Sequence, residues 1–230
     1  MASSDVLDAS EDYRSAIVDL LGVLAYGELM ASQRLASDAA LAPTIEDQVQ
    51  LSTMAAAEFR HFVRLRDRLA DMGVDPAAAM EPFRAPLEAF HEMTAPSDWL
   101  EGLVKAYVGD GIGIDFYREI ASSLDPDTRD LVLDVCEDLG QSAFVVDRVR
   151  AAIAEDPRLE GRLALWARRL VGEALSQAQH VAAEREALTA LLVGDVGAQG
   201  AGMDLTAIGA MLSRLTDAHA RRMQALGLSS

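Results

Sequence analysis

The chain has 230 residues, of which half are hydrophobic and 5% are aromatic, and its formal net charge is −17. This length allows one domain with a full core, and the single cysteine, Cys136, excludes an internal disulfide bond. A surface this acidic repels phosphate backbones, which disfavours tRNA and other nucleic acids as partners. Ala and Leu outnumber β-branched residues, and this favours an all-α fold.

Capping residues, Pro and Gly divide the chain into predicted helices. Four prolines between residues 74 and 97 predict a crossover with at most short helices, in which His91 is expected at the surface. Arginines over 148–169 are interleaved with acids, which is typical of a salt-bridged helix face. We expect helices over 11–38, 44–72, 97–124, 126–154 and 157–192, and an amphipathic helix near 204–226.

The Gly-rich run 194–203 predicts a linker between a bundle domain over 11–193 and a C-terminal amphipathic helix over 204–227. His219 on that helix is expected at the surface. No signal peptide is visible, and Asp19 and Glu28 interrupt the best apolar stretch, so we expect a cytoplasmic protein without a membrane span. The helical faces leave a homodimer open.

Four of the predicted helices each carry one carboxylate on an otherwise apolar stripe. Steps of three and four residues keep each stripe on one helical face. None of the four stripes includes Arg or Lys, and burying an unpaired charge is costly or forces protonation. A divalent metal ion would cancel that charge. The four carboxylates are those of Glu28, Glu58, Asp110 and Asp138.

These carboxylates also fall in mirrored positions. The first pair is centred on Pro43, and the second is centred beside the Asp125–Pro126 turn. Residues equidistant from the turn of an antiparallel hairpin lie at the same height, because each helix rises about 1.5 Å per residue. Two such hairpins face to face place four carboxylates at one level. The expected fold is an all-α, ferritin-like four-helix bundle with a long crossover, a fifth helix and a C-terminal helix.

A bundle of this kind holds two metal ions with one Glu from each of two helices and a Glu-x-x-His motif from each of the other two. In this chain Glu28 and Asp110 stand for the single carboxylates. Glu58 and His61 form one complete motif. The sequence therefore predicts at least one divalent metal ion between Glu58, His61 and a carboxylate of the other hairpin.

The fourth helix departs from the motif, because Asp138 and Gln141 stand where Glu and His are expected. A carboxamide oxygen is a weak, neutral ligand for iron, so a single ion, or a divalent metal other than iron, stays an alternative to two iron ions. His180 and Glu173 would join the site if the helix over 157–192 entered the core. A fifth helix normally packs outside, which favours a polar seam there instead.

The chain resembles the ferritin-like proteins grouped with the methylthio-isopentenyl-adenosine tRNA hydroxylases, and more closely a bacterial branch of that group without assigned function. The resemblance covers 11–193 and is carried by LAYGEL (24–29), AAAEFRHFVRLRDRL (55–69), LEGLVKAYVGDGI (100–112) and LWARRLVGEALSQAQ (165–179). It implies a di-iron site that activates oxygen to hydroxylate a modified base. By this resemblance Glu28, Glu58, His61, Asp110 and Asp138 are the ligands.

Two classes of function follow. The first is an oxygen-activating, non-haem iron oxidoreductase, similar to a hydroxylase, with a small-molecule or unknown substrate and one or two iron ions. The second is a degenerate ferritin-like scaffold with weak or no metal chemistry, which acts as a binding or interaction protein. No reductase domain is visible in the sequence, and no side chain is assigned as catalytic. Iron storage ranks last, because no feature marks a storage shell.

Overall fold

The structure is a computed structural model, and it describes residues 2–137, 141–193 and 205–229. Over these ranges the regular secondary structure is helical. Short 3₁₀ turns at Ala39–Leu41 and Ala121–Ser123 follow the first and the fourth α-helices. The α-helices are α1 (Ala2–Asp38), α2 (Ile45–Asp71), α3 (Pro76–Met93), α4 (Trp99–Ile120), α5 (Pro126–Val135), α6 (Gln141–Glu155), α7 (Arg158–Glu184), α8 (Glu186–Val193) and α9 (Leu205–Leu226).

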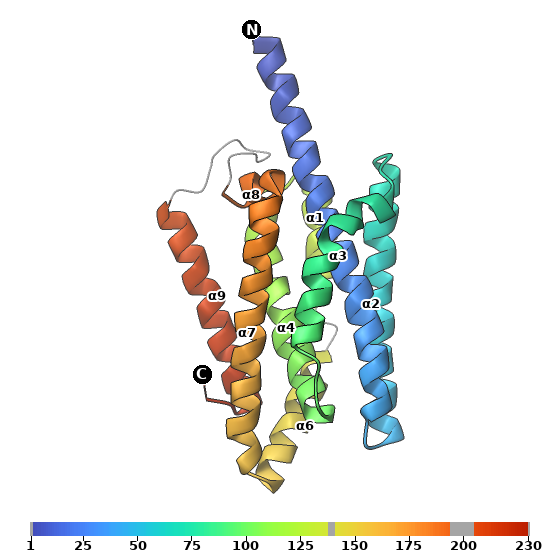
Figure 1. Ribbon diagram of the computed structural model, residues 1–230, viewed down its shortest axis with the longest axis vertical. Helices are drawn as coiled ribbons and strands as arrows, with labels where there is room; N and C mark the ends of the chain where they lie inside the picture. The colour runs from blue at the N-terminus through green and yellow to red at the C-terminus, as the bar shows by residue number, and fades with distance from the viewer. Residues whose placement is uncertain (1, 138–140, 194–204, 230) are drawn as a thin grey trace.

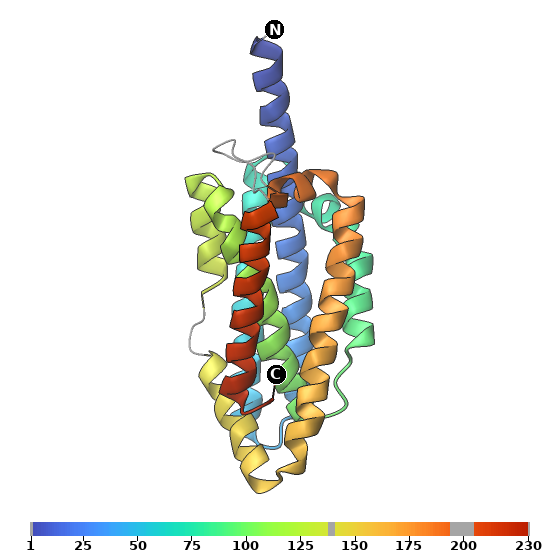
Figure 2. The same cartoon turned by 90° about the vertical axis from the view of Figure 1, so that its left-hand side faces the viewer.

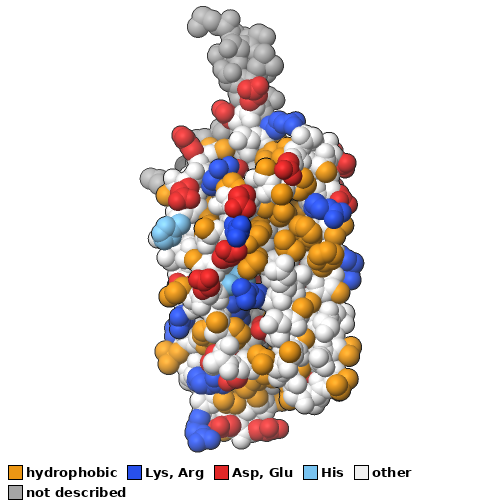
Figure 3. All heavy atoms as spheres, turned by 45° about the vertical axis from the view of Figure 1, so that its right-hand side comes forward, with side chains coloured by type: hydrophobic (Ala, Val, Ile, Leu, Met, Phe, Trp, Pro, Cys, Tyr) orange, Lys and Arg blue, Asp and Glu red, His pale blue; other side chains and the backbone are white. Residues whose placement is uncertain are grey.

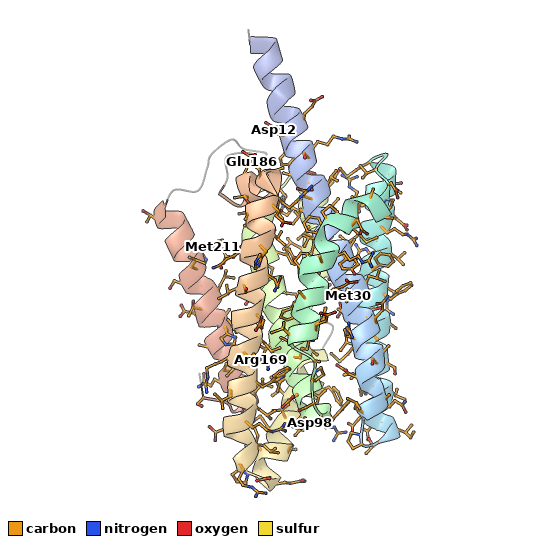
Figure 4. All side chains as sticks on the ribbon, viewed as in Figure 1. Asp12, Met30, Asp98, Arg169, Glu186 and Met211 are labelled. Carbon is orange, nitrogen blue, oxygen red and sulfur yellow. The ribbon has the colours of Figure 1, made fainter. Side chains whose placement is uncertain are left out.

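The long helices run side by side along one axis (Figure 1). Helices α1 and α2 form an antiparallel hairpin, and α3 leads back along α1 to the start of α4. Figure 4 places Asp12 of α1 near one end of the molecule and Asp98, just before α4, near the other. Turned by 90°, α9 crosses in front of α4, with α5 and α6 on one side and α7 on the other (Figure 2).

Local capping explains where the helices that carry the site begin and end. The Thr44 hydroxyl accepts a hydrogen bond from the Asp47 amide, and Gly73 follows α2 with a φ of 73°, so both predicted boundaries of this helix are confirmed. The helix expected over 97–124 begins as α4 after its N-cap, Asp98. The Glu101 carboxylate accepts from the Ser97 amide at 2.8 Å, which completes a capping arrangement displaced by one residue.

Two hydrophobic clusters fill the bundle, one toward each end. One contains the middle of α1, the second half of α2 and the fully buried Phe83 of α3, with parts of α5 and α8. The other contains the first halves of α2, α4 and α7, parts of α6 and the end of α9. Burial of apolar surface in these clusters is the main stabilising contribution. The candidate site lies along α1, α2 and α4 between the two.

The crossover is an 18-residue helix, α3, so the expectation of short helices at most is wrong. Pro76 occupies the first turn, where a missing N–H is tolerated, and the Asp75 carboxylate caps it by accepting from the Ala77 amide. Pro82 and Pro86 lie inside the helix. Burial of Phe83 and close packing on α1, where a Cβ at Gly22 would lie 2.3 Å from the Ala79 carbonyl oxygen, outweigh their cost.

Two predicted long helices are interrupted. The helix expected over 126–154 is divided into α5 and α6, and the break follows Cys136. The helix expected over 157–192 is interrupted at Arg185, whose guanidinium pairs with the buried Asp19 carboxylate and lies over the Phe83 ring. That ion pair fixes the bend, because an unpaired buried carboxylate would be costly. The terminal helix near 204–226 is confirmed as α9, whereas the predicted linker falls outside the described residues.

By length and composition alone, Glu11–Leu41 is apolar enough to cross a membrane, but 56% of its most apolar window is buried inside the bundle. The core stripe of α1 accounts for this composition, because a core helix passes the same test. Cytoplasmic localisation stays a prediction.

Exposed apolar side chains lie on one face of the molecule. Hydrophobic side chains gather on the upper right of the face in Figure 3. On α2, Ile45, Val49 and Phe59 are exposed apolar side chains. The homodimer stays a prediction.

Candidate metal centre

Glu28 of α1 and Glu58 and His61 of α2 converge inside the bundle. Each offers a ligand atom, and these atoms all lie within 4.8 Å of one another. The His61 Nδ1 atom is 3.4 Å from Glu28 Oε2 and 3.5 Å from Glu58 Oε2. The mirrored spacing about Pro43 predicts this meeting, because the short α1–α2 connection keeps the two helices in register.

The three side chains are poorly satisfied without a further partner. Glu28 Oε2 and His61 Nδ1 are buried, and within the described part of the chain neither has a hydrogen bond of good geometry. A buried polar atom without a partner is costly. The pair therefore forms a polar site that the protein by itself does not complete.

Burial and mutual contact shift the pKa values of all three side chains in this cluster. Burial, followed by contact with Glu58, raises the pKa of Glu28 well above its ordinary value. Burial opposes ionisation of Glu58 too, but its interactions with Glu28 and His61 outweigh burial and lower its pKa. Contacts with Glu28 and Glu58 raise the pKa of His61 to about 9. Without metal, protons on Glu28 and His61 compensate the charge.

The donor set fits a divalent metal ion. Two carboxylate oxygens and one imidazole nitrogen are ligands that iron and similar metals accept. A bound cation would displace the protons on Glu28 and His61, because ligands bind metal in their deprotonated forms. It would also give the two unsatisfied buried atoms a partner.

The three residues open onto a cavity of about 360 Å³. Its size falls within the range of small-molecule sites. Leu24 and Leu87 line it beside the polar cluster, with Phe90 and Ile114. The wall therefore combines apolar side chains with a larger number of ionisable groups than the few that are typical of small-molecule sites.

Asp110 of α4 lines the same cavity but lies outside the three-residue cluster. Burial, followed by the Glu58 charge, raises the pKa of Asp110 well above its ordinary value, and the Lys105 charge opposes this. Glycines at 109, 111 and 113 surround it on α4. Asp110 thus faces the site from the opposite hairpin without joining the cluster.

The fourth predicted ligand pair is not described. Asp138 lies outside the described residues, and Gln141 begins α6 but its side chain is not described. Cys136 and Glu137, the two residues that follow α5, line the cavity. Burial, followed by the Glu28 charge, raises the pKa of Cys136 to about 12, so its thiol stays protonated. The metal role of Asp138 and Gln141 stays a prediction.

Helix α7 does not bring His180 to the site. His180 is exposed, and its Nδ1 lies 2.8 Å from the Ser176 carbonyl oxygen of its own helix. Glu173 is partly buried and does not line the cavity. The fifth helix therefore leaves the missing imidazole unreplaced, and His180 takes no part in a buried polar seam.

Among the cavity residues that sequence reasoning missed are His91 and Arg222. His91, expected at the surface, lines the cavity because α3 is a long helix packed against α1. Burial, followed by the charges of Lys105 and Arg34, lowers the pKa of His91 to about 3. Arg222 of α9 also lines the cavity. The only available signal for Arg222 was its place on an amphipathic helix.

Comparison with known proteins agrees with this architecture. The sequence model of a family described as "Ferritin-like domain, actinomycetes" matches residues 11–195. The chain belongs to this family. A solved structure, Synechococcus protein 19 with aldehyde deformylating oxidase activity, matches with a TM-score of 0.70 at 18% identity, over 96% of this chain and 94% of that one. No curated protein matches the sequence. The all-α, ferritin-like fold is thereby confirmed.

Proposed function

We propose that the protein is a non-haem, metal-dependent oxidoreductase that activates oxygen, with Glu28, Glu58 and His61 as ligands of the first metal ion. One observation carries the proposal: two carboxylates and an imidazole meet beside a cavity with buried atoms left unsatisfied. Iron is the proposed metal, because this donor set suits it. The oxidase activity of the Synechococcus protein with the same fold supports this choice.

The protein side chains would bind the metal and shape its surroundings. Bound iron would supply the redox chemistry by which oxygen oxidises an organic substrate. Glu28 and Glu58 neutralise its charge, and His61 gives up the proton that its raised pKa retains in the metal-free state. Asp110 would serve a second ion from the opposite wall. Apolar side chains such as Leu24 and Leu87 exclude water from the substrate space.

The proposed substrate is a small molecule rather than tRNA. Within the arginine run over 148–169, Arg148, Arg158 and Arg162 pair with acids. The other three, Arg150, Arg168 and Arg169, donate to backbone carbonyl oxygens. Paired arginines offer little to a phosphate backbone, which is bound by basic groups that release counterions. The resemblance to tRNA hydroxylases therefore stays a prediction about ancestry and chemistry, not about substrate.

A degenerate scaffold is the second candidate. Gln141 stands where the second motif has His, and α5 ends at Val135, with Cys136 as its C-cap. Both features weaken the α4–α6 half of the centre. In this alternative the bundle folds without metal and the cavity only binds a ligand.

Metal content separates the two candidates. The protein is purified after iron-supplemented expression and analysed for bound elements, beside Glu58→Ala and the exposed control Glu92→Ala. We expect at least one metal ion per chain in the wild type and the control, and its loss in Glu58→Ala. A bound ion also raises the melting temperature. Unchanged metal content and melting temperature in Glu58→Ala would refute the site.

Oxygen uptake by the iron-loaded protein then tests the activity itself. An oxidoreductase consumes oxygen when given a chemical reductant, and the Glu58→Ala protein does not. A metal-loaded wild type that consumes no more oxygen than Glu58→Ala contradicts the enzymatic proposal and supports the scaffold.

A further inference from the structure

The terminal helix α9 delivers one arginine, Arg222, to the wall of the cavity. Helix α9 packs along α4 (Figures 1 and 2). Its Met223 and Leu226 lie fully buried in the hydrophobic core, which fixes the helix beside the cavity. The Arg222 side chain is only 12% exposed. An arginine so deeply placed needs a reason, because burying its charge is costly.

A glycine on α4 makes the space for this arginine. A Cβ at Gly111 would lie 2.2 Å from Arg222 Nε and 2.8 Å from its Cδ, far closer than atoms approach without displacement. The Arg222 Nη2 atom donates to the Gly111 carbonyl oxygen at 2.7 Å and also pairs with the Asp115 carboxylate. Gly111 and Asp115 together form a seat for the guanidinium.

One nitrogen of the guanidinium has no hydrogen-bond acceptor among the described residues. Arg222 Nη1 is buried, and the described residues give it no hydrogen-bond acceptor. The Arg222 side chain, which carries this nitrogen, lines the cavity. An unpaired buried donor is costly, so an acceptor supplied by a ligand would relieve the cost.

The charge around Arg222 determines which acceptor suits it. Asp115 already compensates the guanidinium charge. The Glu137 carboxylate lines the same cavity, and the Arg118 guanidinium there donates to the Cys136 carbonyl oxygen. A second carboxylate would therefore meet like charges rather than an uncompensated cation. An uncharged oxygen, such as that of a ketone, amide or alcohol, accepts from Nη1 without this repulsion.

We propose that Arg222, seated on Gly111 and Asp115, binds the oxygen-bearing head of an uncharged ligand whose apolar body fills the cavity. The volume of about 360 Å³ holds such a body, since it equals roughly a dozen water-sized groups of ~30 Å³. Binding of this ligand does not depend on the proposed oxidoreductase function. Only the identification of the ligand as the substrate rests on that function.

The packing of α9 on α4 does not by itself explain why Arg222 is buried with an unpaired nitrogen. A second arginine of α9, Arg214, holds the helix to α4 through a two-bond pair with Glu119, at 2.8 and 2.7 Å. Arg214 is 56% exposed and does not line the cavity. The two arginines join the same pair of helices, but only Arg222 is buried and incompletely bonded, so Arg214 provides a matched control.

The test is a calorimetric titration of the chelator-treated full chain with 2-octanone and with octanoate. We expect 2-octanone to bind the wild type more tightly than octanoate does. Arg222→Met should weaken 2-octanone binding by about tenfold or more, the range for a hydrogen bond to a charged group. Arg214→Met should leave it within about twofold, because an exposed ion pair contributes little. Gly111→Ala should weaken binding as Arg222→Met does, because it displaces the guanidinium without removing it.

Several results would overturn the proposal. Tighter binding of octanoate than of 2-octanone would show an anion site. Equal effects of Arg222→Met and Arg214→Met would mean that Arg222 only holds α9 against α4 and does not bind the ligand. Unchanged 2-octanone binding by Gly111→Ala would mean the same. Thermal melting of each variant identifies any that is unfolded, and Arg222→Lys, which keeps a donor and a charge, then replaces it with an expected intermediate affinity.

The outcome is separable from that of the proposed function. The titration uses metal-free protein, so loss of ketone binding says nothing against metal binding. Metal content of Arg222→Met should match the wild type, because Arg222 is not among the clustered ligand atoms. Conversely, a wild type that binds no metal but binds 2-octanone through Arg222 would retain the binding site and refute only the oxidoreductase.

Discussion

The two hairpins that face the cavity differ in regularity. On the α1–α2 side both helices are continuous through the site, and three donor atoms lie within 4.8 Å. On the α4–α6 side Asp110 stands apart from that cluster, glycines recur along α4, and the helix chain is interrupted after Cys136. One half of the centre is thus assembled before metal arrives, whereas in the described part of the other half Asp110 lies outside the cluster.

The difference follows from what holds each half. Leu65 and Leu69 of α2 pack in the same buried cluster as Leu20 and Leu21 of α1, which fixes the register of that hairpin. Near Asp110 the chain has Gly109, Gly111 and Gly113, which carry no side chain to pack. Packing of large side chains, rather than helix length, therefore determines which carboxylates meet.

Metal affinity offers the largest test of this asymmetry. Replacing His61 by Ala should weaken binding of the first metal ion by more than about a hundredfold, because it removes a direct ligand, whereas losing an indirect partner costs 10–100-fold. Asp110→Asn should weaken the first ion by less than about tenfold and affect only a second ion. Cobalt titration of chelator-treated protein measures both. Similar losses in the two variants would mean that the halves contribute equally.

A pair of glycines on α4 tests the second half by stability. Gly111→Ala should lower the free energy of unfolding by about 1–3 kcal/mol, the usual cost of overpacking, because its methyl group would collide with Arg222. Gly113→Ala meets only Tyr117 at 3.6 Å, and should raise stability by up to about 1 kcal/mol through helix propensity. Urea unfolding of both variants gives the comparison. A Gly111→Ala protein as stable as Gly113→Ala would mean that Arg222 moves aside without cost.

The pKa values of two histidines on the cavity should be shifted in opposite directions from the ordinary histidine value. In metal-free protein, His61 should lose its proton near pH 9 and His91 near pH 3, because carboxylates surround the first while burial beside Lys105 and Arg34 governs the second. Histidine NMR spectra, assigned with His61→Gln and His91→Gln, follow each ring. Titration of both near pH 6.5 would contradict the described surroundings.

The same shift predicts a modest change in stability with pH. The pKa of His61 is higher in the folded than in the unfolded chain, so its contribution is complete below about pH 6.5 and is lost as pH rises through 9. Relative to His61→Gln, metal-free wild type should lose on the order of 1 kcal/mol over that window. A difference between the two proteins that is independent of pH would exclude the linkage.

The sequence predicted those parts of the molecule that depend on regular spacing. The all-α ferritin-like fold is confirmed, and the meeting of Glu28 with Glu58 follows from their symmetry about Pro43. The prediction failed where distant packing overrides local preference. The prolines of α3 argue against a helix locally, yet Phe83 is fully buried and α3 lies close against Gly22.

Residues brought in by distant helices were beyond the reach of pattern analysis. His91 reaches the cavity only because α3 forms, and Arg222 only because α9 docks on α4. Neither lies on a stripe whose spacing points to the site. The interruption after Cys136 was equally invisible, since Leu131, Val135 and Val145 continue a helical pattern across it.

The most direct test is an anomalous diffraction measurement at the iron edge on crystals of the iron-loaded protein. We expect an anomalous peak among the side chains of Glu28, Glu58 and His61, which would establish the continuous hairpin as the primary metal site. Crystals of the His61→Ala protein, treated in the same way, should lack that peak. A peak elsewhere in the chain, or none beside an intact His61, would contradict the central claim that this half of the centre holds metal first.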